Sequence, residues 1–417
     1  MAETEEIEIL GMIPMAANLP PWQFEAIAEH VEPLKLKKGA RLIECGSDDG
    51  FTYFLTAGKV SLECADNPPI VVEASAESVR TPIANLRPRI VDVTALERIR
   101  VVRVPDILLN AVECGHGKTD PEETSGDTEG QDERRNFETR LPFQLYRDLK
   151  NSESSILPSL PDTAVRIQLA IEDDLSDADA VARLVETDPA IATKLVKTAN
   201  SALYGGRSPV TALTAAVVRL GMQTTRNLVL TFALKEVFRT KNKLLRQRMK
   251  DLWEHSAYIA ATCFVLAREV EGVTPEEALL VGLVHDIGAI AVINYATRDP
   301  QRTADLGGLE QTISCMRGEL GALILRRWKF APTVAVAVRD AESWMREHDG
   351  AADFTDLLIV AQVHERLRKK QTNGLPRIED IPAFAKVLGQ DATPHKSLVI
   401  LHQAEIMVDQ MRSVLRR

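Results

Sequence analysis

The feature that most constrains this chain is a strongly acidic stretch that contains no large apolar residue. Between Gly115 and Arg135 the sequence carries seven carboxylates against three basic residues. Such a segment cannot bury enough apolar surface to offset the conformational entropy that ordering costs. We therefore expect a flexible linker at residues 113–136, which divides the 417-residue chain into separately folded parts.

Upstream of the linker, short apolar or alternating segments predict β-strands that are separated by turn-forming residues such as Ser47–Gly50 and Ala57–Gly58. A helix that opens at Pro20 and Pro21 precedes them. Many short strands at close spacing favour a small antiparallel barrel or roll. The expected strands are 40–45, 52–56, 59–64, 70–74, 90–95 and 99–104.

Downstream of the linker, apolar residues recur with the spacing of amphipathic helices, and helix caps stand where they are expected. Asp188 precedes Pro189 as an N-cap, and Gly221 follows a periodic segment as a C-cap. This part of the chain is predicted to be all-α. Its later expected helices are 246–270, 276–296, 309–328, 353–370 and 395–414.

Composition indicates a globular cytoplasmic protein. Hydrophobic residues make up 45% of the chain and charged residues 26%, which is ordinary for a soluble fold. The net charge of −10 argues against a broadly basic nucleic-acid-binding surface. The five cysteines form no C-x-x-C pair, so we expect reduced thiols. We expect neither export nor membrane insertion, because the start is acidic and His285 and Asp286 interrupt the longest apolar stretch.

Two families resemble parts of this sequence. Residues 13–112, with PPWQFEAIAEHV, KKGARLIECG and FTYFLTAGKVSL, resemble the cyclic-nucleotide-binding roll. Residues 157–345 are similar to the HDOD domain, an output module related to HD phosphohydrolases. The latter resemblance rests on LPSLPDTAVRI, ETDPAIATKLVKTANSALYGG, PVTALTAAVVRLGMQTTRNLVL and LVGLVHDIGAI.

Together these resemblances predict a multidomain protein, with a small N-terminal α+β roll of the cyclic-nucleotide-binding type followed by an all-α HDOD helical bundle. The expected divisions are the β-roll at residues 1–112, the acidic linker at 113–136, a connecting helix at 137–156, the HDOD domain at 157–350 and a C-terminal helical extension packed on it at 351–417.

In the roll family, backbone N–H groups and an Arg hold the cyclic phosphate, while a Glu binds the ribose. Here Pro88-Arg89 matches the Pro-Arg of that cassette, but Arg80 and Thr81 stand where the family has Gly-Glu. The following Pro82 removes a backbone donor. We therefore expect the roll to pack or dock rather than to bind a cyclic nucleotide. Arg80, Arg87 and Arg89 could bind another anion, or they could form a solvated edge.

The HD phosphohydrolase pattern of metal ligands is present only in part. His255 and, 30 residues later, the pair His285-Asp286 match three expected ligands. The resemblance places the last ligand, an Asp, at Gln362, where a neutral amide is a poorer ligand. The Lys that follows the pair in the phosphohydrolases is Ala289. The three matching residues are either ligands of Fe, Mn or Zn or a buried polar cluster of a helix bundle.

From these observations we expect a non-catalytic cytoplasmic signalling protein of the bacterial type, without a cofactor, that acts through protein–protein contacts. The alternative is a metal-dependent phosphohydrolase acting on a nucleotide or cyclic dinucleotide, and a third interpretation is a cyclic-nucleotide sensor. The basic run Arg239–Lys250 is either a site for an acidic partner or nucleic acid, or a solvated helix face. We expect protein rather than nucleic acid or a membrane as the partner.

Overall fold

The computed structural model describes residues 31–64, 67–75, 81–115, 141–172, 177–206, 208–299 and 305–389, with 399, 402–403 and 405–406 beyond them. The expected opening helix and most of the expected acidic linker lie outside these residues, as do Arg80 and most of the expected last helix, while the first three linker residues, 113–115, are helical. The chain forms two compact units. The first contains Met1–Leu157 and Ala291–Val336, and the second contains Pro158–Ile290 and Ala337–Arg417. The division into these units groups residues 291–336, which fall within the expected HDOD domain, with the strands. It reflects contact density only, so the expected domain boundaries stay a prediction.

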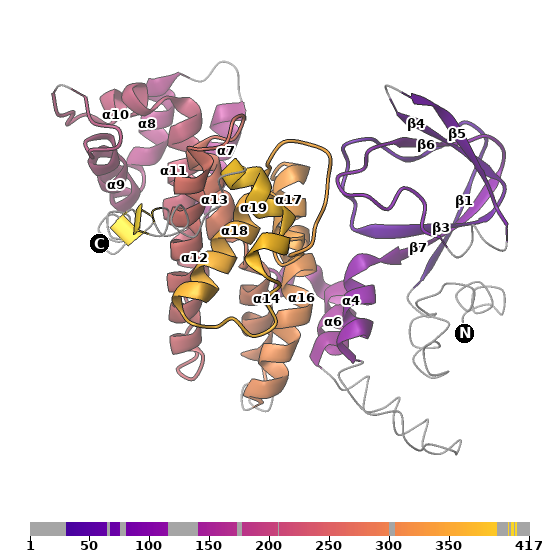
Figure 1. The fold of residues 1–417 in the computed structure, drawn as a ribbon. Helices are drawn as coiled ribbons and strands as arrows, with labels where there is room; N and C mark the ends of the chain where they lie inside the picture. The colour runs from indigo at the N-terminus through magenta and orange to yellow at the C-terminus, as the bar shows by residue number, and fades with distance from the viewer. Residues whose placement is uncertain are drawn as a thin grey trace. The chain divides into compact units, whose positions relative to one another are not determined.

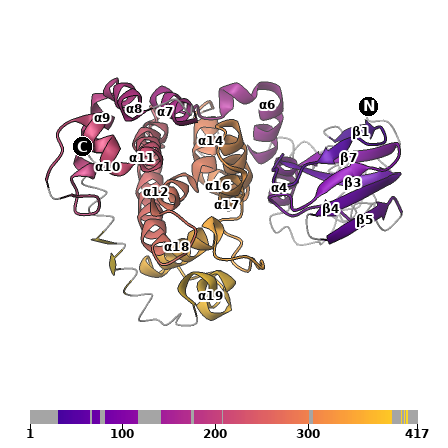
Figure 2. The same cartoon turned by 90° about the horizontal axis from the view of Figure 1, so that it is seen from above.

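The first unit contains two antiparallel sheets (Figures 1 and 2). One sheet has the order β1-β7-β3 and the other the order β2-β6-β4-β5. Alternate side chains of both sheets, among them Leu55, Val60, Val93 and Ile99, form one apolar core. The strands are β1 (Glu32–Leu36), β2 (Arg41–Ile43), β3 (Phe51–Ala57), β4 (Lys59–Cys64), β5 (Asn67–Glu73), β6 (Asp92–Ala95) and β7 (Ile99–Pro105).

The six strands expected from the sequence are present, with shifts of a few residues at their ends. Strand β1 was not predicted, although its alternating burial, with Leu34 and Leu36 partly buried, has the period of a strand. Helix α4 (Asp106–Gly115) was also missed, since β7 leads into it without a turn signal (Figure 1).

Two helices of the first unit pack on α4. It contacts α6 (Leu141–Ile156), which lies within the expected connecting helix, and α16 (Leu306–Arg327). Cys315 of α16 is disulfide-bonded, so the expectation of five reduced thiols is wrong. Tyr295, in α14 (Ile287–Ala296), donates a hydrogen bond to Asp148 of α6 at 2.7 Å. Helix α17 (Pro332–Arg339) follows α16 in the sequence.

The second unit is entirely helical among its described residues. Helices α8, α9 and α10 pack on one another (Figure 2), while α12 packs on both α13 and α18. The helices are α7 (Asp162–Glu172), α8 (Ala178–Glu186), α9 (Pro189–Ala199), α10 (Leu213–Leu220), α11 (Met222–Leu234), η2 (Lys235–Phe238), α12 (Arg246–Ala267), α13 (Pro275–Val284), α18 (Phe354–Arg368), η3 (Ile378–Asp380) and α19 (Pro382–Leu388).

Local capping explains where these helices begin and end. The Asp188 carboxylate accepts hydrogen bonds from the backbone N–H groups of Ala190 and Ile191, as the sequence predicts. Gly221 has a φ of 81° and separates α10 from α11. The expected helix 276–296 is interrupted at residues 285–286, where α13 gives way to α14. This stretch, Pro275–Ala296, is apolar and long enough to cross a membrane, but 94% of its most apolar window is buried inside the protein.

Candidate metal centre

His255 and the His285-Asp286 pair come together from two packed helices of the second unit. His255 lies in the middle of α12, whose later turns are buried. Asp286 and His285 form the turn that follows α13, so they do not lie within one continuous helix as the sequence suggested. The two helices approach closely at Gly282, where a Cβ would lie only 2.6 Å from the Cα of Ala260.

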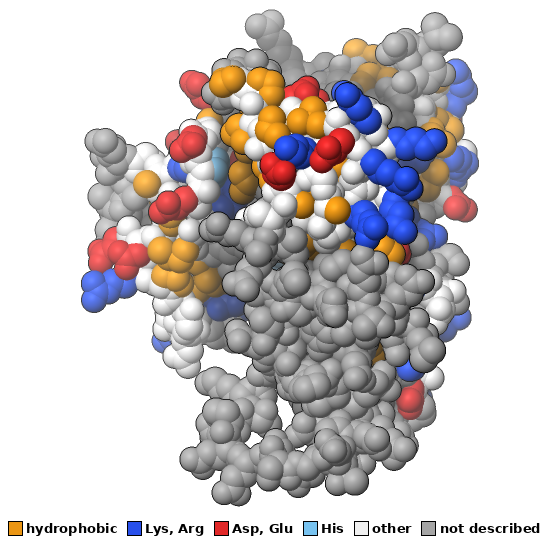
Figure 3. All heavy atoms as spheres, turned by 90° about the vertical axis from the view of Figure 1, so that its right-hand side faces the viewer, with side chains coloured by type: hydrophobic (Ala, Val, Ile, Leu, Met, Phe, Trp, Pro, Cys, Tyr) orange, Lys and Arg blue, Asp and Glu red, His pale blue; other side chains and the backbone are white. Residues whose placement is uncertain are grey.

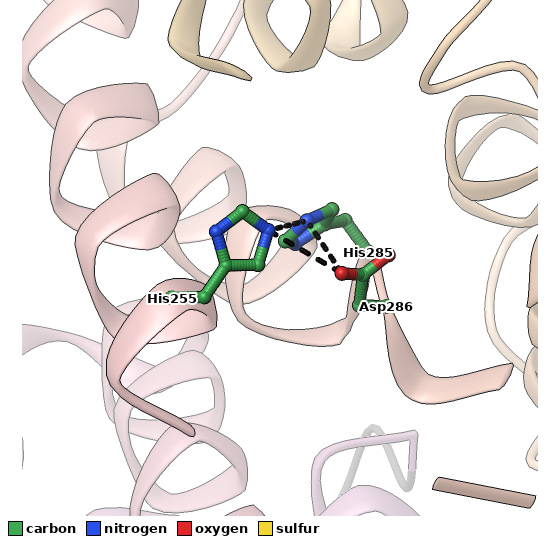
Figure 4. A group of neighbouring side chains, drawn as sticks. All are labelled: His255, His285 and Asp286. Carbon is green, nitrogen blue, oxygen red and sulfur yellow. Dashed lines mark hydrogen bonds and ion pairs between the residues drawn. The ribbon is translucent and has the colours of Figure 1, made fainter. Parts of the chain in front are cut away.

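The three side chains direct one atom each toward a common point (Figure 4). The Nε2 atoms of His255 and His285 lie 3.0 Å apart. Asp286 Oδ2 lies 3.3 Å from the first of these nitrogens and 3.5 Å from the second. His285 and Asp286 are almost fully buried, whereas one fifth of the His255 side chain is exposed. The sequence therefore predicted these three residues as a cluster, and the structure brings them together.

The opposite ring nitrogens of both histidines have hydrogen-bond partners. His285 Nδ1 lies 2.8 Å from the carbonyl oxygen of Gly282. His255 Nδ1 contacts the carboxylate of Glu365. A carbonyl and a carboxylate can only accept, so both histidines carry their proton on Nδ1 when they are neutral. Their Nε2 lone pairs then face the common point.

Glu365 is the residue that the sequence did not reveal. It lies on α18, three residues after Gln362, and its other carboxylate oxygen is 2.8 Å from Lys369 Nζ. Gln362, the expected position of a last ligand, instead donates its amide N–H to the carbonyl of Ala341 at 2.5 Å. The signal that could have indicated Glu365 is its i,i+3 spacing from Gln362, which places both side chains on neighbouring parts of one helix surface.

A comparison with protein families gives this helical region a family. The model of the HDOD domain matches residues 157–343. Residues 157–343 form an HDOD domain. The match covers somewhat less than half of the chain, and it ends before α18.

Three individual proteins resemble this chain. An uncharacterized protein of Treponema pallidum is 26% identical over 198 residues, which are 44% of this chain but only 37% of that protein. A crystal structure from Shewanella amazonensis, described as a candidate metal-dependent phosphohydrolase, is 27% identical with a TM-score of 0.49, covering 64% of this chain and 98% of that one. One from Marinobacter aquaeolei, described as a candidate signal transduction protein, is 16% identical with a TM-score of 0.45, covering 96% and 100%.

The donor atoms of His255, His285 and Asp286 are spaced so that they could bind one metal ion. Zinc lies about 2.0–2.2 Å from imidazole nitrogen and carboxylate oxygen, so ligands at tetrahedral or octahedral angles are about 3.0–3.5 Å apart. The three observed separations fall within this range. Two imidazoles and one carboxylate suit Fe, Mn or Zn. A bound ion would supply Lewis acidity at this point.

Without a metal ion, a proton can hold the cluster together. Burial disfavours the charged form of His255, but its contacts with Asp286 and Glu365 outweigh burial and raise the pKa to about 9. For Glu365, burial would raise the pKa, yet its contacts with His255 and Lys369 lower it. Three acceptor atoms at one point therefore require a cation, and either a proton or a metal ion meets this requirement.

Two of the three arginines that we considered for anion binding, Arg87 and Arg89, are already engaged inside the β-roll. Arg89 is 1% exposed, and it donates to Asp49 and to the backbone carbonyls of Ala84 and Phe51. The Arg87 side chain is also buried and donates to Asp106 at 3.1 Å. Neither residue lies on a solvated edge. The cyclic-nucleotide-binding character of the roll stays a prediction, as does an anion site at these residues.

His364 is fully buried beside Phe384. Neither of its ring nitrogens has a hydrogen-bond partner. Burial lowers its pKa to about 4, so it is neutral at physiological pH. It is a core residue, with no neighbouring donor set among the described residues that would make it a ligand.

Proposed function

We propose that this chain is a non-catalytic cytoplasmic signal-transduction protein whose HDOD domain acts through contacts with other proteins. The observation that carries this proposal is the engagement of Gln362 by the Ala341 carbonyl. Gln362 is therefore not available as a fourth ligand, and the cluster offers only the three donors of His255, His285 and Asp286, which suit a single ion. Hydrolysis of a phosphate ester needs further positive charge on the transferred group, and Ala289 stands where the phosphohydrolase pattern has a Lys.

The turn before α12 supports the part of the proposal that concerns protein contacts. Leu244 is 74% exposed, and exposed Lys241, Lys243 and Arg246 surround it in sequence. The Asn242 side chain accepts a hydrogen bond from the Leu244 N–H at 2.9 Å and holds this turn in shape. An exposed apolar side chain among cations is suited to an acidic protein partner with an apolar recess.

In the same proposal the β-roll is a docking module. Its exposed surface carries the basic residues Lys35, Lys37, Lys38, Arg98 and Arg100, and Figure 3 shows Lys and Arg side chains gathered on the side of the molecule that it draws. Lys35 and Arg100 stand directly opposite each other on β1 and β7. An acidic partner surface would be complementary to these exposed cations.

Turnover measurements test the proposal. The purified chain, loaded in turn with Mn²⁺, Fe²⁺ or Zn²⁺, would be assayed with bis(p-nitrophenyl) phosphate, ATP and cyclic di-GMP. We expect no hydrolysis above that of His285→Ala. A photo-crosslinking amino acid at position 244 is expected to capture a protein in cells of the source organism, and substitution of Lys241, Lys243 and Arg246 by Glu is expected to abolish this capture.

The second candidate function is the metal-dependent phosphohydrolase, which acts on a nucleotide or cyclic dinucleotide. The specific observation in its favour is the triangle of donors formed by His255, His285 and Asp286. In this function these three residues would hold the ion. Turnover that is abolished by His285→Ala but retained in Leu244→Ala would establish this function and refute the non-catalytic one.

A further inference from the structure

The carboxylate of Glu365 comes from outside the residues that match the HDOD family. It lies on α18, whereas the match ends at residue 343. Helix α18 packs directly on α12, which carries His255. The Glu365 side chain is only 4% exposed, and its two oxygens are divided between His255 Nδ1 and Lys369 Nζ. Such a buried carboxylate is stable only when cationic or donor groups compensate it.

This contact decides which nitrogen of His255 faces the cluster. Because the carboxylate accepts from Nδ1–H, the neutral ring is held in the tautomer that leaves Nε2 as an acceptor. The Gly282 carbonyl does the same for His285 at 2.8 Å. An outer partner of this kind fixes the tautomer and the ring orientation of a metal-ligating histidine and raises its basicity. Removal of Glu365 would free the His255 ring to rotate, since one fifth of its side chain is exposed.

We propose that Glu365 is a positioning residue that orients His255 so that the HDOD domain and α18 together hold a single divalent transition-metal ion at His255, His285 and Asp286. Gln362 has no part in this site. The inference goes beyond the proposed function, because it holds equally for an ion that only stabilises the bundle and for one that takes part in catalysis.

The test uses the full chain and two kinds of measurement. Zinc affinity is determined by competition with a chromophoric chelator for the wild type, Glu365→Ala, Glu365→Gln and Gln362→Ala. We expect a 10- to 100-fold weaker affinity in Glu365→Ala, the usual effect of removing an outer partner. Glu365→Gln should lose less, because the amide oxygen still accepts from Nδ1–H. The control Gln362→Ala should stay within about threefold of the wild type, since its side chain bonds Ala341.

The second measurement needs no metal. Side-chain ¹⁵N shifts of metal-free protein at a pH above 9 report the tautomer of each histidine. We expect Nδ1–H for His255 in the wild type and in Glu365→Gln, and a mixture in Glu365→Ala. His285 should keep the Nδ1–H tautomer in all three, because its partner is a backbone carbonyl. Far-UV circular dichroism verifies that each variant is folded.

Three outcomes would overturn the inference. One is a wild-type protein that does not bind Zn²⁺ or Mn²⁺ at all. Another is a folded Glu365→Ala variant whose zinc affinity is within twofold of the wild type. The last is an Nε2–H tautomer for His255 in the wild type. If Glu365→Ala does not fold, Glu365→Gln decides: retention of the Nδ1–H tautomer with a zinc affinity less than 10-fold weaker supports the inference, and an Nε2–H tautomer for His255 in this folded variant overturns it.

Discussion

A buried ion pair inside the first compact unit connects the β-roll to helix α16, and its contribution to stability can be measured directly. Arg326, near the end of α16, donates from Nη1 to Asp48 Oδ2 at 2.8 Å. The Asp48 side chain is fully buried and only one fifth of Arg326 is exposed. Arg87 Nε lies 3.5 Å from the other Asp48 oxygen. Arg326 belongs to the HDOD match and Asp48 to the roll, so this pair joins the two parts of the unit.

The substitution Arg326→Met removes the charge and keeps most of the apolar stem. Breaking a buried pair by removing one partner costs about 3–5 kcal/mol. Since Arg87 still compensates part of the Asp48 charge, we expect the lower end, about 3 kcal/mol. For a unit of this size, that lowers the melting temperature by about 6–12 °C. Asp48→Asn combined with Arg326→Met should reveal a coupling energy of about 1–3 kcal/mol.

Differential scanning calorimetry of the full chain measures the four members of this double-mutant cycle. The control is Arg41→Met, because Arg41 is 57% exposed and 3.8 Å from Asp92. Exposed pairs of this kind contribute about 0–1 kcal/mol. A coupling energy below 0.5 kcal/mol, or a control variant as destabilised as Arg326→Met, would refute the reasoning.

Three further predictions concern the helical unit. His364→Phe should make the free energy of unfolding less sensitive to acid. The pKa of His364 is about 4 in the folded protein against 6.5 in the unfolded chain. The contribution of His364 to wild-type stability is therefore fully present above pH 6.5 and is lost as the pH decreases toward 4, with a loss of about 2 kcal/mol at pH 5. Urea unfolding at pH 7 and 5 checks this, and an equal loss in both proteins would contradict it. Gly282→Ala should lower the free energy of unfolding by at least about 1–3 kcal/mol, because its Cβ would lie 2.6 Å from Ala260 Cα. Thermal melting checks this, and an unchanged melting temperature would show that α12 and α13 can move apart to admit the methyl group. Tyr204→Phe should cost about 1–3 kcal/mol in urea unfolding through the loss of its 2.6 Å hydrogen bond to Glu276, and a stability equal to the wild type would mean that this bond contributes nothing.

The sequence indicated some residues of the candidate site but not all of them. His255, His285 and Asp286 were predicted together because a family pattern preserves their types and spacing. Their common orientation depends on the break between α13 and α14, which the sequence did not reveal because residues 276–296 were expected to form one helix. Glu365 was not assigned, because its i,i+3 spacing from Gln362 indicates a shared helix surface but not which surface of α18 packs on α12.

The sequence by itself determined the types and most positions of the secondary-structure elements. Periodicity, caps such as Asp188 and the glycine at 221 are local properties, and each acts within a few residues of itself. Only the tertiary structure decided that Arg87 and Arg89 are compensated inside the roll and that Asp48 pairs with a residue 278 positions away. Burial and charge compensation depend on which surfaces meet, and the free energy of a buried ion is set by partners that are remote along the chain.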